Sequence, residues 1–155
     1  MKHIQREVAF TELLPLIEDS FRQGLTVTLP ITGRSMRPLL LHKRDSVVLS
    51  ACDPHSLIRG DVPLYRRDNG QYVLHRIVHV CQDTYTLTGD AQWELETDLP
   101  KENVLAVMTG FIRKGKAVDC RSVGYRVYVA VWMWLRPFRP LIVRIWRTLH
   151  GSKRT

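Results

Sequence analysis

The chain has 155 residues, of which 45% are hydrophobic and 25% charged, a composition typical of one globular domain and not of a disordered or low-complexity chain. The net charge is +8. The segment 121–155 accounts for all of it, because it holds eight lysines and arginines and no acidic residue. Residues 1–120 are therefore neutral overall, so that part offers no basic surface for nucleic acid.

Cysteine spacing and hydropathy indicate the cellular compartment of the protein. Cys52, Cys81 and Cys120 form no CxxC or Cys/His pattern, which predicts free thiols in a reducing compartment and argues against a structural zinc site. We expect neither a metal nor a cofactor. The first 21 residues are interrupted by charge and lack the apolar core of a signal peptide. The longest apolar run, 127–135, has nine residues, about half of a bilayer span. We therefore expect a cytoplasmic protein, with or without peripheral attachment to the inner face of the membrane.

The N-terminal segment, residues 1–24, predicts an amphipathic helix. Between residues 5 and 23, apolar side chains recur at helical spacing with charged residues between them, and Gly24 follows as a C-terminal cap. The stretch 25–32 then alternates Leu, Val, Leu and Ile with threonines, as a half-buried strand does. Pro30 within it favours an edge position or a bulge.

Short strands with turn signals between them continue to residue 120. We expect strands at 45–52, 61–67, 71–81 and 84–89, and a long strand with a short return over 103–120. Asp68-Asn69-Gly70 is a hairpin turn signal, and Lys114-Gly115 marks a second turn. This pattern predicts a mainly β fold for residues 25–120, built of bent antiparallel sheets or a partly open barrel.

The segment 121–155 returns to helical spacing, with a break at Pro137 and Pro140. Arginines alternate there with tryptophan and phenylalanine, as in helices that lie at a membrane interface. We expect this basic, aromatic-rich helical tail to contact an anionic membrane surface. The alternative is a helix packed on the sheet with a solvated basic edge, and nucleic acid is the less favoured partner.

Ser35 stands in "GRSMRPLL", just after the first predicted strand, and is a candidate nucleophile. A serine hydroxyl needs an adjacent base at neutral pH, and His75 is the best placed of the six histidines. On the predicted strand 71–81, alternation puts His75 on one face with Ile77 and His79, between apolar neighbours. Partial burial would keep its imidazole neutral and able to accept a proton. Taken alone, Ser35 could be a turn residue and His75 a core residue.

Four short motifs together resemble the type I signal peptidases and the related self-cleaving repressors, over residues 28–113. They are Ser35-Met36-Arg37-Pro38, Gly60-Asp61, His75-Arg76-Ile77 and Gly89-Asp90. Any one of them is weak, whereas four in order and spacing make a strong signal. The histidine before Arg76 resembles the endoplasmic-reticulum branch of the family, since other members carry lysine there. The resemblance implies a peptidase domain of that fold at 25–120, with Ser35 as nucleophile and His75 as general base.

The sequence offers more than one candidate for the acidic residue that orients the histidine. In the histidine branch it is an aspartate in or shortly after the second Gly-Asp motif, and "GDAQWELETDLP" offers three candidates. We favour Asp90, then Asp98, then Glu96, which stands where the family has its later aspartate. Asp90 could equally be a turn residue after Gly89.

The resemblance also implies roles around the serine. The backbone N–H of Ser35 would bind the oxyanion, and Gly33 stands where some relatives add a hydroxyl. Met36 would contribute to the substrate groove, or else belong to the core. Ordinary signal peptidases carry a membrane-spanning segment before the serine motif, and this chain has a charged helix there instead.

These observations predict a serine endopeptidase that acts on a peptide or protein substrate, such as a leader-bearing peptide. The alternative is a non-catalytic binding or regulatory module of the same fold, attached to membrane or nucleic acid through its tail. Self-cleavage is a third possibility, although no Ala-Gly site and no DNA-binding domain precede Ser35.

Overall fold

The structure is a computed structural model that describes residues 10–150, apart from the side chains at positions 143, 146, 147, 149 and 150. It is mainly β, with nine strands, three α-helices and two short 3-10 helices in the described part. All strand pairs are antiparallel. The predicted fold class is confirmed at this level.

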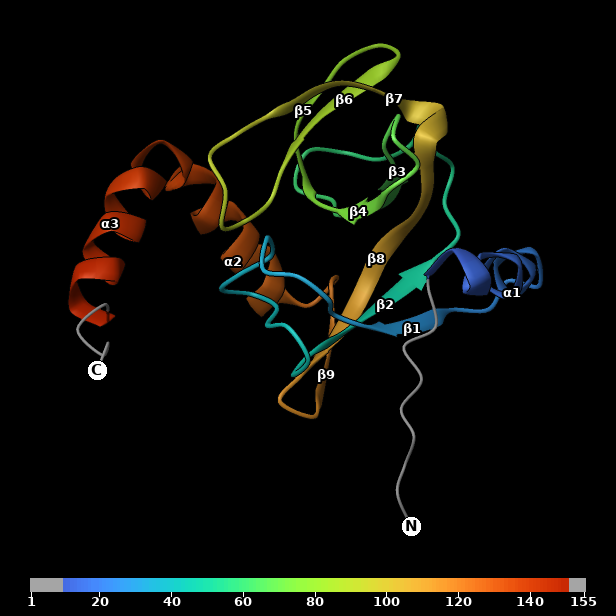
Figure 1. The fold of residues 1–155 in the computed structure, drawn as a ribbon, viewed down its shortest axis with the longest axis horizontal. Coiled ribbons are helices and arrows are strands. Elements are labelled where there is room, and N and C mark those ends of the chain that lie inside the picture. The colour runs from blue at the N-terminus through green and yellow to red at the C-terminus, as the bar shows by residue number, and fades with distance from the viewer. Residues whose placement is uncertain (1–9, 151–155) are drawn as a thin grey trace.

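Two sheets make up the body (Figure 1). The larger runs in the order β1-β2-β8-β3-β4, with β9 also paired to β8, and the smaller in the order β5-β6-β7. The strands of the larger sheet are β1 (Val27–Pro30), β2 (Ser46–Ser50), β3 (Pro63–Arg66), β4 (Tyr72–Leu74), β8 (Val104–Arg113) and β9 (Lys116–Asp119). Those of the smaller sheet are β5 (Arg76–Val80), β6 (Thr84–Thr88) and β7 (Glu96–Pro100). The larger sheet is curled, because β8 is long and its pairings with β2 and β3 both contain a register shift.

Most of the predicted strands form close to their expected places. Pro30 lies on β1, which is an edge strand, as its missing N–H requires. Gly70 has a φ of 83° in the hairpin between β3 and β4, where Arg67 N–H donates to the Gln71 carbonyl. Two predictions were wrong. The single strand over 71–81 is divided at His75 into β4 and β5, which belong to different sheets, and β7 was not expected.

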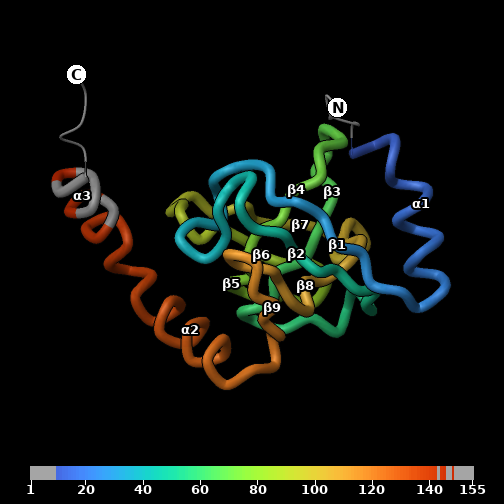
Figure 2. The backbone as a smooth tube through the Cα atoms, turned by 90° about the horizontal axis from the view of Figure 1, so that it is seen from below, coloured from blue at the N-terminus to red at the C-terminus, as the bar shows by residue number. Residues whose placement is uncertain are grey.

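The helices lie at opposite ends of the molecule (Figure 2). Helix α1 (Phe10–Arg22) buries Ile17, and Gly24 follows it with a φ of 72°; residues 5–9 of the predicted helix lie outside the described part. Helix α2 (Val123–Trp134) begins at the N-cap Ser122. The 3-10 turn η2 (Arg136–Phe138) separates it from α3 (Arg139–His150) at the predicted proline break. A second 3-10 turn, η1 (Lys101–Asn103), precedes β8.

Two apolar clusters form the core. The first fills the larger sheet and includes Leu40, Leu49 and Tyr125, with α1 and α2 packed against it. The second lies under the smaller sheet and includes Tyr65, Ile77 and Leu87. The chain crosses from the first sheet to the second at His75, so this residue sits where the two sheets meet.

Candidate active site

Ser35 lies in the loop between β1 and β2, which is fixed by contacts just before the serine and at the serine itself. Before it, Gly33 has a φ of 109°, a conformation that favours glycine, and its N–H donates to His42 Nδ1 at 3.0 Å. At Ser35 itself the carbonyl accepts from Ala91 N–H at 2.8 Å. The Ser35 side chain is half-buried, and its backbone N–H has no hydrogen-bond partner within residues 10–150.

His75 is held through one nitrogen of its ring. The residue is 3% exposed, and Nδ1 lies 3.1 Å from the Tyr65 hydroxyl and 3.2 Å from Glu96 Oε1. The Tyr65 hydroxyl donates to Glu96 Oε2 at 2.8 Å, and it has only one proton to give. An ionised carboxylate can only accept, so the proton between Nδ1 and these oxygens must belong to the imidazole. Neutral His75 is therefore the Nδ1–H tautomer, and Nε2 carries the free lone pair.

Glu96, on β7, is fixed in turn by Arg67 beyond the end of β3. Arg67 Nε donates to Glu96 Oε2 at 3.1 Å, Nη2 donates to Oε1, and Nη1 donates to Gln71 Oε1 at 2.8 Å. Burial raises the pKa of Glu96, but donors from Arg67 and Tyr65 outweigh it, and the net pKa is below the ordinary value. Burial lowers the pKa of His75, and the charge of Glu96 only partly opposes this. At neutral pH the pair therefore consists of a carboxylate and a neutral imidazole.

Ser35 and His75 line the same cavity, which has a volume of about 390 Å³. The walls come from the serine loop, β4 and the loop after β6. The lining residues are Ile31, Thr32, Gly33, Arg34, Ser35, Met36, Arg67, Gln71, Tyr72, Val73, Leu74, His75 and Gln92. Within the described residues, the Ser35 hydroxyl forms no direct hydrogen bond to the imidazole, and His75 Nε2 has no hydrogen-bond partner. Ser35 and His75 thus line one cavity without a direct hydrogen bond between them.

Asp90, the acid favoured from the sequence, contacts a different residue. Its two oxygens accept from Arg76 Nε at 2.8 Å and Nη2 at 2.7 Å, and both side chains are fully buried. Asp98 is exposed on β7 with a φ of 58°, and among residues 10–150 it has no hydrogen bond or ion pair to His75. Glu96, placed third from the sequence, is the acid that touches the imidazole. Among the three candidates, only Glu96 has a contact to the imidazole within residues 10–150.

The buried Arg76–Asp90 pair ties the four motifs together. Arg76 Nη1 also donates to the Gly60 carbonyl at 2.9 Å and to the Tyr125 hydroxyl of α2 at 3.1 Å. Gly60 N–H donates to the Ile77 carbonyl, and Ile77 N–H to the Asp61 carbonyl. Asp90 follows Gly89, whose Cα lies so close to the serine loop that an added Cβ would be 2.7 Å from the Ser35 carbonyl oxygen. The motifs thus form one scaffold beneath Ser35.

Met36 belongs to the core and to the cavity at once. It is 3% exposed within the first apolar cluster, and it also lines the space that Ser35 and His75 share. Its place in the core is thus observed, and a role in binding substrate stays a prediction.

Sequence reasoning missed Tyr65 and Arg67, which hold Glu96. Their spacing on the predicted strand 61–67 puts both on one face, and this was an available signal. The spacing alone does not identify their partner, because the sequence pattern does not predict β7, the strand that carries Glu96. Among residues 10–150, no group of three histidine, cysteine, aspartate or glutamate side chains is arranged to hold a metal ion.

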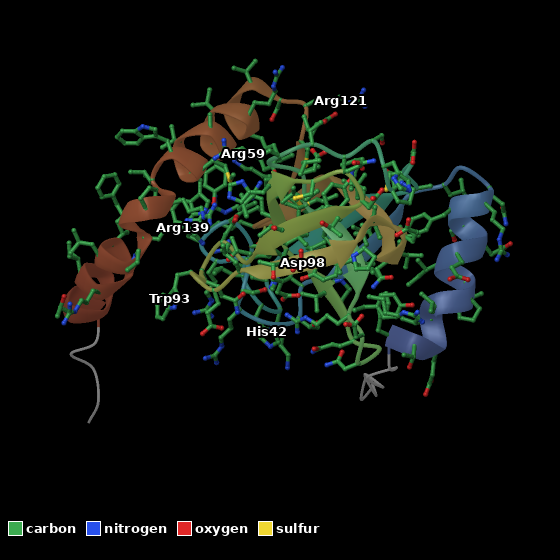
Figure 3. All side chains as sticks on the ribbon, turned by 90° about the horizontal axis from the view of Figure 1, so that it is seen from above. His42, Arg59, Trp93, Asp98, Arg121 and Arg139 are labelled. Carbon is green, nitrogen blue, oxygen red and sulfur yellow. The ribbon has the colours of Figure 1, made fainter. Side chains whose placement is uncertain are left out.

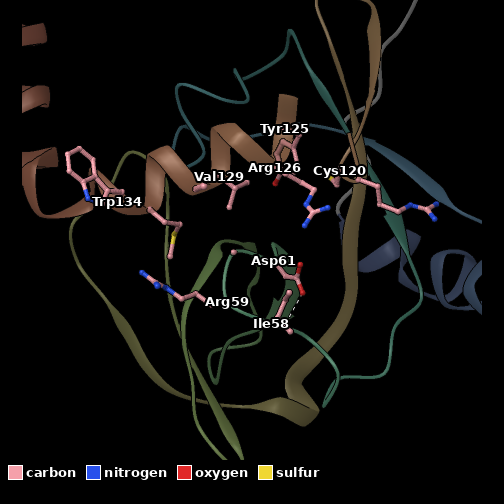
Figure 4. A pocket seen from close by; sticks show the side chains of 12 residues that line it. Ile58, Arg59, Asp61, Cys120, Tyr125, Arg126, Val129 and Trp134 are labelled. Atoms are coloured by element: carbon pink, nitrogen blue, oxygen red, sulfur yellow. Dashed lines mark hydrogen bonds between the residues drawn. The ribbon is translucent and has the colours of Figure 1, made fainter. Parts of the chain in front are cut away.

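A larger cavity of about 770 Å³ lies apart from the serine, between the loop 58–61 and α2 (Figure 4). Val129, Met133 and Trp134 supply apolar walls, and Asp61 accepts a hydrogen bond from Ile58 N–H at 2.8 Å. Burial raises the pKa of Asp61. The cavity contains none of the residues predicted to carry the chemistry.

No protein-family model matches the chain, and no curated protein sequence matches it. Within the described range, no helix has both the length and the apolar character needed to cross a bilayer.

Proposed function

We propose that the chain is a serine endopeptidase of the signal-peptidase-like type, with Ser35 as nucleophile and His75 as general base. The observation that carries the proposal is the shared cavity, which is lined by Ser35 and by His75, whose Nδ1 is held by Glu96 and Tyr65. This arrangement leaves Nε2 as the only ring atom able to take a proton. Glu96 replaces Asp90 in the third role, as the residue that positions the histidine.

The proposed reaction is acyl transfer in two stages. When a peptide enters the cavity, His75 Nε2 takes the Ser35 proton as the oxygen attacks the scissile carbonyl. The free Ser35 N–H is available to the oxyanion. The imidazolium, stabilised by Glu96, then gives its proton to the leaving amine. In the second stage His75 Nε2 takes a proton from water as the water oxygen attacks the acyl-serine. The same proton then goes to the Ser35 oxygen, which restores the hydroxyl and releases the acid.

Substrate preference follows from the resemblance and the shape of the site. The resemblance to the signal peptidases implies a preference for small residues near the cut, and Met36 lies in the wall of the serine cavity, where it would contact them. We propose a peptide or protein substrate with small side chains near the cut, such as a leader-bearing peptide.

A peptide library derived from a digested proteome tests this function. The purified chain should create new termini, read by mass spectrometry, with small residues enriched before the cut. Ser35→Ala should create none. Ser56→Ala is the matched control, because this exposed hydroxyl bonds its own loop at the Asp53 carbonyl and lies outside the cavity. Identical termini from the wild type and Ser35→Ala would contradict the proposal.

A second candidate is a non-catalytic module that binds through its tail. It is favoured by the lack of a direct hydrogen bond between Ser35 and His75. In that case the wild-type chain would leave the library uncut while still binding its partner.

A further inference from the structure

A third cavity, of about 370 Å³, lies where the C-terminal helices meet the body. Figure 3 shows Arg59, Trp93 and Arg139 gathered in this region. It is lined by Arg59, Trp93, Met133, Arg136, Pro137, Arg139 and Pro140. Three of these seven residues carry guanidinium groups, and none carries a carboxylate. None of them lines the serine cavity.

Arg139 is the deepest of the three arginines. It is 3% exposed, and its guanidinium carbon lies 4.9 Å from the centre of the Trp132 ring. Its Nη2 donates to the Trp132 carbonyl at 3.4 Å, whereas Nε and Nη1 are buried without a hydrogen-bond partner. Unpaired buried donors on a charged group are costly, because nothing replaces the water that they lose.

No carboxylate in the described part neutralises this cluster. Arg59, Arg136 and Arg139 take part in none of the ion pairs among residues 10–150. Asp90 attracts Arg139 electrostatically, but both of its oxygens are already bound to Arg76. Burial, followed by the charge of Arg59, lowers the pKa of Arg136, as expected for cations facing each other. The cavity therefore holds positive charge and free donors that an anion would satisfy.

We infer that Arg59, Arg136 and Arg139 form a binding site for a phosphate group. Guanidinium groups present forked N–H donors that match phosphate oxygens, and three of them can contact several oxygens at once. The volume leaves room for the group attached to the phosphate.

A phospholipid headgroup is the source of phosphate that the surroundings favour. Trp134, Phe138, Leu141 and Ile145, on the same helices, are each at least half exposed. Apolar side chains beside a cationic pocket are the arrangement by which interfacial helices bind anionic lipid. A free phosphate compound is the other source, and the experiment separates the two.

Binding of phosphate can be followed at Trp93 in the full chain. Its indole N–H signal, identified by Trp93→Phe, should shift saturably when inorganic phosphate replaces sodium chloride at constant ionic strength. In the Arg59→Gln/Arg136→Gln variant the affinity should fall at least tenfold. Both residues are less buried than Arg139, so we expect this variant to fold as the wild type does. Arg126→Gln/Arg144→Gln is the control, because it removes the same charge from exposed positions outside the cavity.

Flotation with phosphatidylcholine vesicles, with or without phosphatidylglycerol, identifies the source. For a lipid headgroup, the wild type and the control variant float with the anionic vesicles and the Arg59/Arg136 variant does not. If vesicle binding is equal in the two double variants while Trp93 still responds to phosphate, the ligand is a free phosphate compound. A Trp93 signal that does not saturate, or that shifts equally in the Arg59/Arg136 variant, would overturn the site.

Discussion

Glu96 is the side chain on which the proposed state of His75 depends most directly. Substituting it as Glu96→Gln should lower kcat at least 100-fold, because an amide can donate to Nδ1 and so favour the wrong tautomer. The charge of Glu96 raises the pKa of His75 against the effect of burial, so its loss should lower that pKa further. The acid limb of kcat/KM, which in the wild type lies below the ordinary histidine value of about 6.5, should therefore move to lower pH.

The control for this prediction is Glu94→Gln, two residues earlier and exposed. It should keep both the rate and the pH profile of the wild type. If Glu96→Gln behaves like Glu94→Gln, then Glu96 does not position the base.

Gly89 is required by the closeness of two loops. A Cβ at this position would lie 2.7 Å from the Ser35 carbonyl oxygen and 2.8 Å from the Ser35 Cβ. Gly89→Ala should therefore displace the nucleophile and lower kcat/KM at least tenfold, since displacements near 1 Å can cost about 100-fold. Gly124→Ala on α2 meets no atom within 4 Å and should leave the rate unchanged. Equal rates for the two variants would show that the serine loop tolerates the shift.

The sequence was a good guide to single residues when their role depends on a motif. It predicted Ser35 and His75 for one site, and both line the same cavity. It placed Asp90 before Asp98 and Glu96, because chain order does not reveal which carboxylate another element already binds. Both carboxylate oxygens of Asp90 accept hydrogen bonds from Arg76, and that contact depends on the packing of β5 beside the loop after β6.

The Arg76–Asp90 pair connects β5, the Gly60 turn and α2. Asp90→Asn would leave a fully buried guanidinium without its counter-charge, a loss of about 3–5 kcal/mol in the free energy of unfolding. Urea denaturation should show this loss, whereas Asp98→Asn, at an exposed residue with positive φ, should be nearly neutral. A stable Asp90→Asn variant that loses activity as Glu96→Gln does would instead give Asp90 a role in catalysis.

Elements were predictable where periodicity and turn residues agreed. The edge strand with Pro30, the hairpin at Gly70, the long β8 and the divided helical tail all formed as expected. The break at His75 could not be read from the sequence, since "YVLHRIVHV" is a continuous strand pattern although its halves join different sheets. Strand β7 contains two acidic residues and a proline, and its pairing with β6, not its own propensity, places it in the sheet.

At the scale of the whole molecule, the two C-terminal helices contribute differently. Helix α2 brings the Tyr125 hydroxyl to Arg76, and Val129 lies against Gly60. Helix α3 makes its main contacts with η2. Removing residues 141–155 should therefore leave the thermal midpoint and the cleavage rate close to those of the full chain.

Removing residues 121–155 should lower the free energy of unfolding by about 3 kcal/mol or more, because Arg76 would lose a partner and the first apolar cluster would be exposed. Thermal melts followed by circular dichroism compare the two truncations. Equal midpoints for both would show that α2 is not part of the folded body.

The most direct test of the proposed function is a double-mutant comparison of kcat/KM on one peptide cleaved in the library. Residues that act as one unit lose nearly all activity when either is removed. We predict that Ser35→Ala, His75→Ala and the combined variant share one residual rate, at least 1,000-fold below the wild type, while Ser56→Ala is unaffected. A His75→Ala variant within tenfold of the wild type, or a combined loss equal to the product of the single losses, would contradict it.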